Sequence, residues 1–210
     1  MTRTKQRRSE ATVAAIVTAA RELFGRHGFS EVSLDSVAGA CGRTKGAIYH
    51  HFGTKEVLFE EVFRREQRHL ADEVVAAGTS SDPVDAFTEG ITRYLSLIAA
   101  DPITGRITLL DAPSVLGWMQ WRRCDGGPFR LLCAAALDRM VQAGRLRSGQ
   151  DPDLLVDVIL GAVTEAALVV ATSTDPAGAA PRLAACCASL ISGITTRGDV
   201  GQVHSHTVHP

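Results

Sequence analysis

Apolar residues recur at the spacing of an α-helix over most of the 210-residue chain. The first run lies between Ser9, which can cap a helix, and Gly28, which can end one. Its apolar face consists of Val13, Ile16, Val17, Ala20, Leu23 and Phe24. The pattern predicts one amphipathic helix here, and we expect the polar, basic residues 1–8 before it to form a mobile arm.

Three further helices are predicted in close succession. A short one covers residues 34–41 and ends at Gly42, and the next covers residues 44–51 after only a short turn. A longer helix then runs over residues 54–77. This arrangement predicts a helix-turn-helix domain at residues 9–53, followed by a connecting helix.

The rest of the chain also has helical periodicity. Proline and glycine residues divide it into expected helices at about 83–100, 102–111, 113–124, 127–144, 152–173 and 179–196. No window shows the sustained alternation of a β-strand with hairpin turns. The sequence therefore predicts an all-α protein with a second, larger domain at residues 78–197 and a disordered polar tail at 198–210.

The last two long helices, at about 152–173 and 179–196, are apolar on nearly all sides. A helix without a polar face is covered on both sides, either by its own chain or by a second subunit. Because small residues are interspersed and allow close helix approach, we favour a homodimer seam over a buried monomer core. No membrane span is expected, since the longest stretch without Asp, Glu, Lys or Arg is Leu183–Thr196.

Charge is divided unevenly along the chain, although the net charge is only −1. Residues 1–55 hold nine Lys or Arg against four Asp or Glu, a net of +5, and the remainder carries −6. A basic first quarter suggests a polyanionic partner for that part. The five cysteines lack a CxxC spacing, and no signal-peptide cleavage site follows the first apolar run, so we expect reduced thiols and a cytoplasmic protein.

The predicted turn and third helix have the chemistry of a DNA reader. The core between the two short helices would consist of Val37, Ala38, Cys41, Ile48 and Phe52. The reachable positions would be Thr44, Lys45, Gly46, Tyr49 and His50. Because Gly46 has no side chain, the helix backbone can approach a DNA groove closely. Tyr49 could instead be a core aromatic, but exposure is favoured.

Residues Val37–Glu56, VAGACGRTKGAIYHHFGTKE, resemble the helix-turn-helix signature of TetR/AcrR-type transcriptional regulators. The similarity is close over roughly residues 10–60 and is architectural beyond that. It implies a dimer that binds double-stranded DNA at a palindromic operator, most often as a repressor.

The resemblance also assigns roles to individual residues. It implies that Thr44, Lys45, Gly46 and Tyr49 face DNA and that Lys55, at a helix N-terminus, binds phosphate. Arg43 departs from the family pattern, which usually has an apolar residue there. Either Arg43 is exposed and adds a DNA contact or the turn is repacked, and we favour exposure.

TetR-like regulators release DNA when a small molecule binds the second domain, so an effector site is expected. The strongest candidate segment holds both tryptophans of the chain, and its large flat side chains suit an apolar or aromatic effector. The candidate residues are Leu110, Val115, Trp118, Met119, Trp121 and Arg122, together with Glu165 in the apolar helix at about 152–173. The alternative is that these side chains are ordinary core packing.

Other functions remain open at this point. A metal- or thiol-responsive regulator would use the tail histidines or the adjacent cysteines: His204, His206, His209, Cys186 and Cys187. A regulator without an effector is a further alternative. An enzyme is unfavoured because no nucleophile elbow, P-loop, dinucleotide-binding glycine pattern or HExxH motif is present. No cofactor and no dedicated metal site are predicted.

Overall fold

The structure is a computed structural model that describes residues 2–196, except for the side chains of 2–6, 8 and 123–126. The expected tail at 198–210, with its three histidines, lies outside these residues. The helices are α1 (Thr2–His27), α2 (Leu34–Cys41), α3 (Lys45–Phe52), α4 (Lys55–Ala77), α5 (Pro83–Ala100), α6 (Pro102–Gly105), the π-helix η1 (Arg106–Asp111), α7 (Ala112–Leu116), α8 (Trp118–Gln142), α9 (Pro152–Thr172) and α10 (Pro176–Ile194). The described chain contains no strand, which confirms the all-α prediction.

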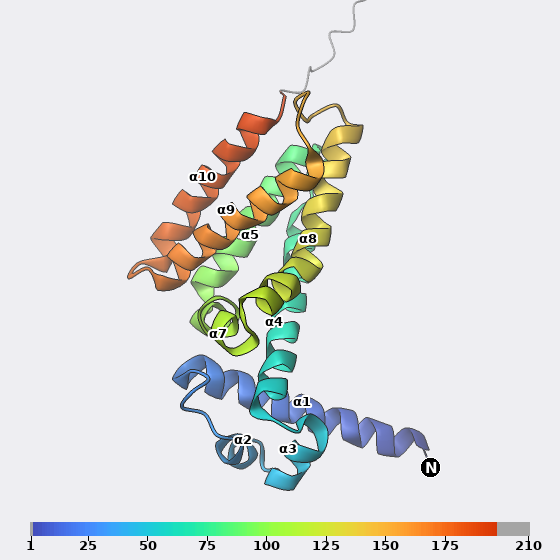
Figure 1. Ribbon diagram of the computed structural model, residues 1–210, viewed down its shortest axis with the longest axis vertical. Coiled ribbons are helices and arrows are strands. Elements are labelled where there is room, and N and C mark those ends of the chain that lie inside the picture. Colours follow the sequence, from blue (N-terminus) through green and yellow to red (C-terminus); the bar gives the residue numbers. More distant parts are fainter. Residues whose placement is uncertain (1, 197–210) are drawn as a thin grey trace, which may run out of the picture.

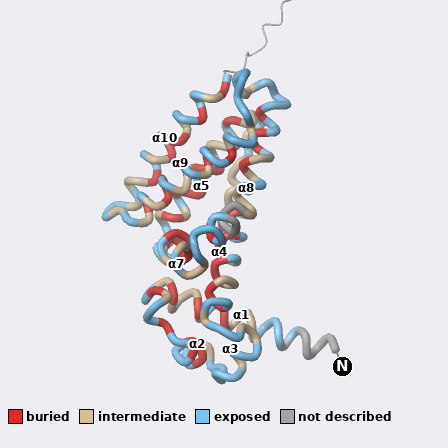
Figure 2. Tube along the Cα trace, in the orientation of Figure 1, coloured by how far each residue is buried: buried red, intermediate tan, exposed pale blue. Residues whose placement is uncertain are grey.

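The molecule is elongated, with a small head of α1–α3 at one end and a larger body of α5–α10 at the other (Figure 1). The long helix α4 belongs to both parts, because it packs against α1 of the head and against α5 and α8 of the body. Buried residues recur at each turn of α4 from Leu58 to Ala71, between the head and the body (Figure 2). The two parts therefore share one hydrophobic core.

Two predicted boundaries are wrong. Helix α1 begins at Thr2 instead of near Ser9, so residues 2–8 are helical and not an arm. No proline or glycine separates them from the amphipathic run, and their polar residues are compatible with a helix. The predicted break near residues 124–127 is also absent, because α8 continues through it with Pro128 inside the helix. Buried side chains before and after this point, such as Trp121 and Leu137, hold both halves against the body.

The segments predicted at 102–111 and 113–124 are divided differently. The first begins as α6 and continues as the π-helix η1. The second is interrupted at Gly117, whose φ of 81° few other residues adopt, and α8 begins directly after it. The tryptophans expected on one helix with Val115 therefore lie on α8, while Val115 lies on α7.

A buried ionic network joins the head to the body. The Arg21 guanidinium of α1 donates to both carboxylate oxygens of Glu66 on α4, over 2.7 and 3.1 Å. It also donates to Asp101, which ends α5, and to the Thr104 hydroxyl on α6. The Thr104 hydroxyl in turn donates to Glu66 over 2.6 Å. One arginine of α1 thus links α4 to the junction of α5 and α6.

The network has a defined protonation state. Burial by itself would raise the pKa of Asp101, but the hydrogen bond and the charge of Arg21 outweigh it and hold that pKa below its ordinary value. Burial would likewise lower the pKa of Arg21, yet its bonds to Glu66 and Asp101 raise it. The Asp101 carboxylate therefore stabilises the fold at neutral pH, and this contribution is lost as the pH falls through its lowered pKa.

We predict that Glu66→Ala lowers the free energy of unfolding by about 3 kcal/mol, because it leaves the half-buried Arg21 cation with one carboxylate fewer. Urea unfolding followed by circular dichroism measures this loss. Glu73→Ala is the matched control, since Glu73 also lies on α4 and pairs with an arginine, Arg93, but at the surface. Equal losses for the two variants would show that the network does not hold the head to the body.

Candidate nucleic-acid interface

Helices α2 and α3 are each fixed by local hydrogen bonds. At the start of α2 the Ser33 and Ser36 side chains each accept from the other residue's backbone N–H, over 3.0 and 3.1 Å. Gly42 ends α2 in the left-handed conformation, with φ 62° and ψ 36°. The Thr44 hydroxyl then caps α3 by accepting from the Ala47 N–H over 3.2 Å. These caps fix the turn between the two helices.

The expected core of this unit is largely confirmed. Val37, Ala38 and Ile48 are buried, and the half-buried Cys41 and Phe52 pack against the same core. Ile48 is the one buried residue of α3. Most of this helix is therefore available to a partner.

All six expected contact positions before α4 are exposed: Arg43, Thr44, Lys45, Gly46, Tyr49 and His50. Arg43 is exposed, as favoured, and its expected DNA contact stays a prediction. A Cβ built on Gly46 would meet only the Thr44 hydroxyl, at 4.0 Å, so the backbone there can be approached closely. Helices α2 and α3 lie at the end of the molecule farthest from the body (Figure 1).

Lys45 and Tyr49 form a small cluster on this exposed surface. The Lys45 ammonium donates to Asp35 of α2 over 2.7 Å and lies 5.9 Å from the centre of the Tyr49 ring. The hydrogen bond to Asp35 raises the pKa of Lys45, so this side chain stays charged. Because this ion pair is exposed, the Lys45 ammonium can exchange Asp35 for a phosphate at little cost in free energy.

Lys55 is placed differently from the expectation. Its ammonium donates to the carbonyl oxygens of Phe29 and Val32, both over 2.9 Å, and reaches that of Ser30 at 3.5 Å. It also lies 4.2 Å from the centre of the Phe29 ring. Its three N–H groups are directed to the loop between α1 and α2. In this structure the side chain thus fastens that loop to α4, and its expected contact with phosphate stays a prediction.

The expected effector residues fall into two groups. Five line a cavity of about 600 Å³ between the start of α8 and α9: Trp118, Met119, Trp121, Arg122 and Glu165. Leu110 and Val115 do not line it. Trp121 is buried, and its indole N–H donates to the Thr108 carbonyl of η1 over 2.9 Å, so it is partly a packing residue. Trp118 and Met119 are exposed.

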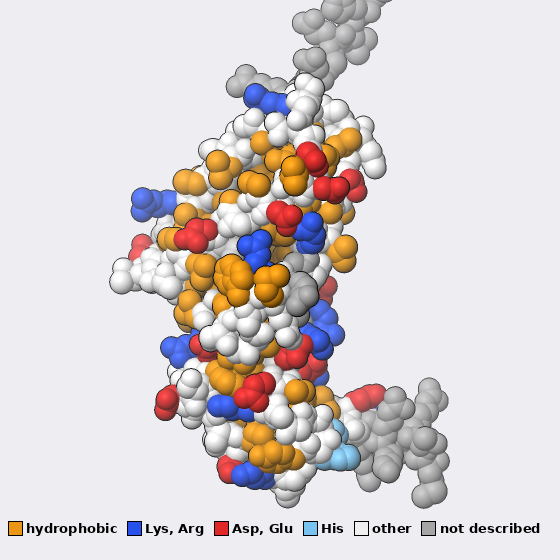
Figure 3. Space-filling model, viewed as in Figure 1, with side chains coloured by type: hydrophobic (Ala, Val, Ile, Leu, Met, Phe, Trp, Pro, Cys, Tyr) orange, Lys and Arg blue, Asp and Glu red, His pale blue; other side chains and the backbone are white. Residues whose placement is uncertain are grey.

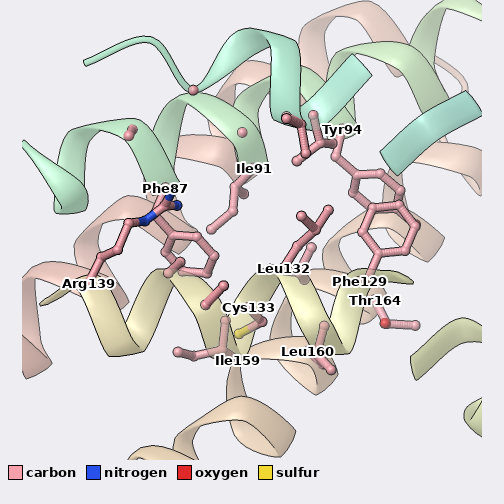
Figure 4. A pocket seen from close by; sticks show the side chains of 18 residues that line it. Phe87, Ile91, Tyr94, Phe129, Leu132, Cys133, Arg139, Ile159, Leu160 and Thr164 are labelled. Atoms are coloured by element: carbon pink, nitrogen blue, oxygen red, sulfur yellow. The ribbon is translucent and has the colours of Figure 1, made fainter. Parts of the chain in front are cut away.

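A second cavity, of about 210 Å³, was not anticipated. It lies between the end of α4, α5, α8 and α9, and its wall is mostly aliphatic and aromatic (Figure 4). The side chains of Phe87, Ile91 and Tyr94 follow one face of α5, and the Phe129 ring of α8 lies 5.2 Å from that of Tyr94. This spacing was visible in the sequence, but it is equally typical of core packing. Leu160 and Thr164 line both cavities, which therefore adjoin.

The cysteines that the structure describes differ in exposure. Cys133, in the wall of the smaller cavity, is buried, and burial raises its pKa to about 12. Burial also raises the pKa of Cys187, whereas Cys186 is exposed. Both buried thiols are therefore protonated and weakly reactive at neutral pH. Within residues 2–196, the described side chains form no group of three His, Cys, Asp or Glu that could hold a metal ion.

Comparison with known proteins gives a match over most of the chain. Residues 16–62 match the sequence model of bacterial regulatory proteins of the tetR family, and residues 84–194 match the tetracyclin repressor-like C-terminal domain. The "Probable acrEF/envCD operon repressor" of Escherichia coli K12 is 35% identical over 102 residues, which are 47% of this chain and 46% of that repressor. The chain thus matches about half the length of this relative.

Solved structures share the whole architecture. A TetR-family transcriptional regulator from Pectobacterium atrosepticum superposes with a TM-score of 0.76 at 27% identity, covering 94% of this chain and 99% of that one. The SmeT–triclosan complex has the same fold, with a TM-score of 0.69 at 22% identity over 95% and 98% of the two chains. The family sequence models cover both the head and the body. The chain belongs to the TetR family of bacterial transcriptional regulators.

Proposed function

We propose that this protein is a cytoplasmic transcriptional repressor that binds a palindromic operator as a homodimer and releases it when a small apolar or aromatic effector binds the body. The observation that carries the proposal is the exposure of α3, on which only Ile48 is buried. The contact residues would be Arg43, Thr44, Lys45, Gly46, Tyr49 and His50. A selection of random duplexes by the purified protein tests this, and recovery of a palindrome is the expected result.

The dimer is supported by the surface of α9 and α10. Both helices are long and apolar enough to cross a membrane by length and composition, yet only 28% and 22% of their most apolar windows are buried within one copy. Leu154, Val158 and Val169 of α9 and Leu190 of α10 are exposed. Hydrophobic side chains accordingly appear on the face of the body that α9 and α10 form (Figure 3). A second copy of the same two helices would cover this face.

A dimer would present two α3 helices to one face of the duplex. Successive major grooves require them roughly 34–36 Å apart. In another conformation of the dimer the two α3 helices would lie at a different distance from each other. An effector that binds the body more tightly in that conformation would release DNA. The same coupling requires that DNA weakens effector binding by the same factor. Helix α4 is the physical connection, because Val74, Val75 and the following Gly78 line the smaller cavity while Lys55 holds the head.

The proposed effector site consists of the two adjoining cavities. The wall of the smaller cavity is mostly apolar, as is usual for small-molecule pockets, whereas the larger cavity adds the charged side chains of Arg122, Arg130, Asp157 and Glu165. The structural neighbour SmeT was solved with triclosan. In this chain the larger cavity, which the two tryptophans line, meets the smaller cavity at Leu160 and Thr164. One effector can therefore contact both cavities.

We predict that Gly46→Ala weakens operator binding by roughly tenfold, the scale of a lost base contact, because the added methyl separates α3 from the groove. The fold should be unaffected, since the new Cβ meets open space. Fluorescence anisotropy with the selected operator measures the affinity. Gly127→Ala, also inside a helix with open space around it, is the control and should bind as the natural protein does. Equal affinity of both variants would show that α3 does not lie in the groove.

We predict that Lys55→Met lowers the free energy of unfolding by about 2 kcal/mol, because the carbonyls of the α1–α2 loop lose their donor. The slope of log Kd against log salt should stay unchanged, because we propose that this ammonium keeps its bonds to the loop carbonyls in the complex. A slope reduced by about one would instead show that Lys55 turns to the DNA in the complex.

We predict that the natural protein sediments at twice its 22.3 kDa mass at micromolar concentration, and that the double variant Leu154→Glu/Val158→Glu sediments as a monomer. Buried carboxylates in a seam are costly because they lose their hydration. Leu131→Glu, at an exposed leucine of α8, is the control and should remain dimeric. A monomeric natural protein would contradict the proposal that a dimer places two α3 helices on one operator.

A further inference from the structure

The smaller cavity has a charged group at its edge, although its wall is mostly apolar. Among the described residues that line it, Arg139 is the one charged side chain, and no carboxylate is present. Arg139 lies on α8 and is exposed. Its side chain extends along the cavity edge to the Phe87 ring, whereas Tyr94 and Phe129 lie at the opposite end (Figure 4).

The Arg139 guanidinium has no carboxylate partner among the described residues, whereas three other arginines of the body have one. Arg93 pairs with Glu73, Arg130 pairs with Asp157, and Arg145 pairs with Asp82. A guanidinium offers two parallel N–H groups that match a carboxylate. An unpaired one at the edge of an apolar cavity therefore favours an anionic group on whatever fills the cavity.

We propose that the effector is a small apolar carboxylic acid, whose carboxylate pairs with Arg139 and whose apolar part lies toward Tyr94 and Phe129. This inference rests on the proposed effector role of the cavities and specifies the chemical class that they take. The volume of about 210 Å³ is below the roughly 300–1,000 Å³ common for drug-sized ligands, so the acid is small. A larger apolar part would extend past Leu160 and Thr164 to the tryptophan side.

The other polar groups of the wall agree with an anion held at one end only. The Cys133 thiol is protonated, because burial raises its pKa to about 12. Thr164 contributes a hydroxyl at the far end, next to Phe129 (Figure 4). An organic cation would find no acidic group in this wall and would meet Arg139 as a like charge. The arrangement therefore distinguishes acids from amines of equal shape.

The test uses three probes with one carbon skeleton: 4-phenylbutyrate, 4-phenylbutan-1-ol and 4-phenylbutylamine. Binding to the full-length protein is measured by isothermal titration calorimetry. We expect the acid to bind about tenfold or more tightly than the alcohol, as for a hydrogen bond to a charged group, and the amine to bind most weakly. Absence of a preference for the acid, or of any binding of the acid at millimolar concentration, overturns the proposal.

Variants of the protein test whether Arg139 causes the preference for the acid. Arg139→Met should reduce acid affinity to that of the alcohol and leave alcohol affinity within about twofold, while Arg139→Lys should keep part of the preference. Arg182→Met, which removes an exposed arginine of α10 outside both cavities, should change nothing. Leu132→Trp, which fills the cavity from its wall, should weaken both probes. A preference that survives Arg139→Met, or binding unaffected by Leu132→Trp, overturns the proposal.

Operator binding, measured on the same samples, separates this proposal from the proposed function. Under the proposal the acid releases the operator from the natural protein at concentrations about tenfold lower than from the Arg139→Met variant. If the natural protein binds the operator but shows no acid preference, only the ligand class is wrong. If it binds no duplex at all, the proposed function fails independently of the probe affinities.

Discussion

The contact between Arg21 and Glu66 is the constraint on which the arrangement of head and body depends. Glu66 lies in the middle of α4 and is almost fully buried, so its charge requires a partner. Arg21 provides it from α1 and at the same time binds Asp101 and Thr104 of the body. The hydrophobic core sets which helices meet, but this charged network sets the position of α1 along α4.

The contact between head and body also leaves no room for a side chain at one position of α1. A Cβ on Gly25 would overlap the Ile103 side chain of α6, so α1 and α6 approach closely only because that residue is glycine. Beyond it, the Phe29 N–H donates to Asp111 at the end of η1 over 3.0 Å. The head thus touches α4, α6 and η1 at once. These contacts are a route by which a shift of α6 or η1 in the body would reach α1 and the surface that carries α3.

The sequence predicted the elements whose signals are local. The exposed face of α3 could be predicted because Gly42 ends α2, Thr44 begins α3, and Ile48 is the one large aliphatic residue of α3. The role of Lys55 could not, because its partners are backbone carbonyls more than twenty residues earlier, and no residue type marks them. The cavity beside Arg139 was missed for a similar reason, since four helices contribute to its wall and each alone has an ordinary apolar face. The helix through Pro128 was missed because packing on both sides outweighs the local preference of Gly126, Gly127 and Pro128.

The surfaces that one copy leaves incomplete differ in chemistry, and this difference indicates different partners. Helix α3 exposes hydroxyl, ammonium and phenol groups on a short rod, which suits the edges and phosphates of a duplex. Helices α9 and α10 expose aliphatic side chains, which water solvates poorly and which a second copy would bury. The cavity beside Arg139 combines an apolar wall with one unpaired cation, which neither DNA nor a helix face would satisfy. Under these proposals a single chain has separate places for a nucleic acid, a second copy and a small anion, and α4 would be the element through which occupation of one changes the others.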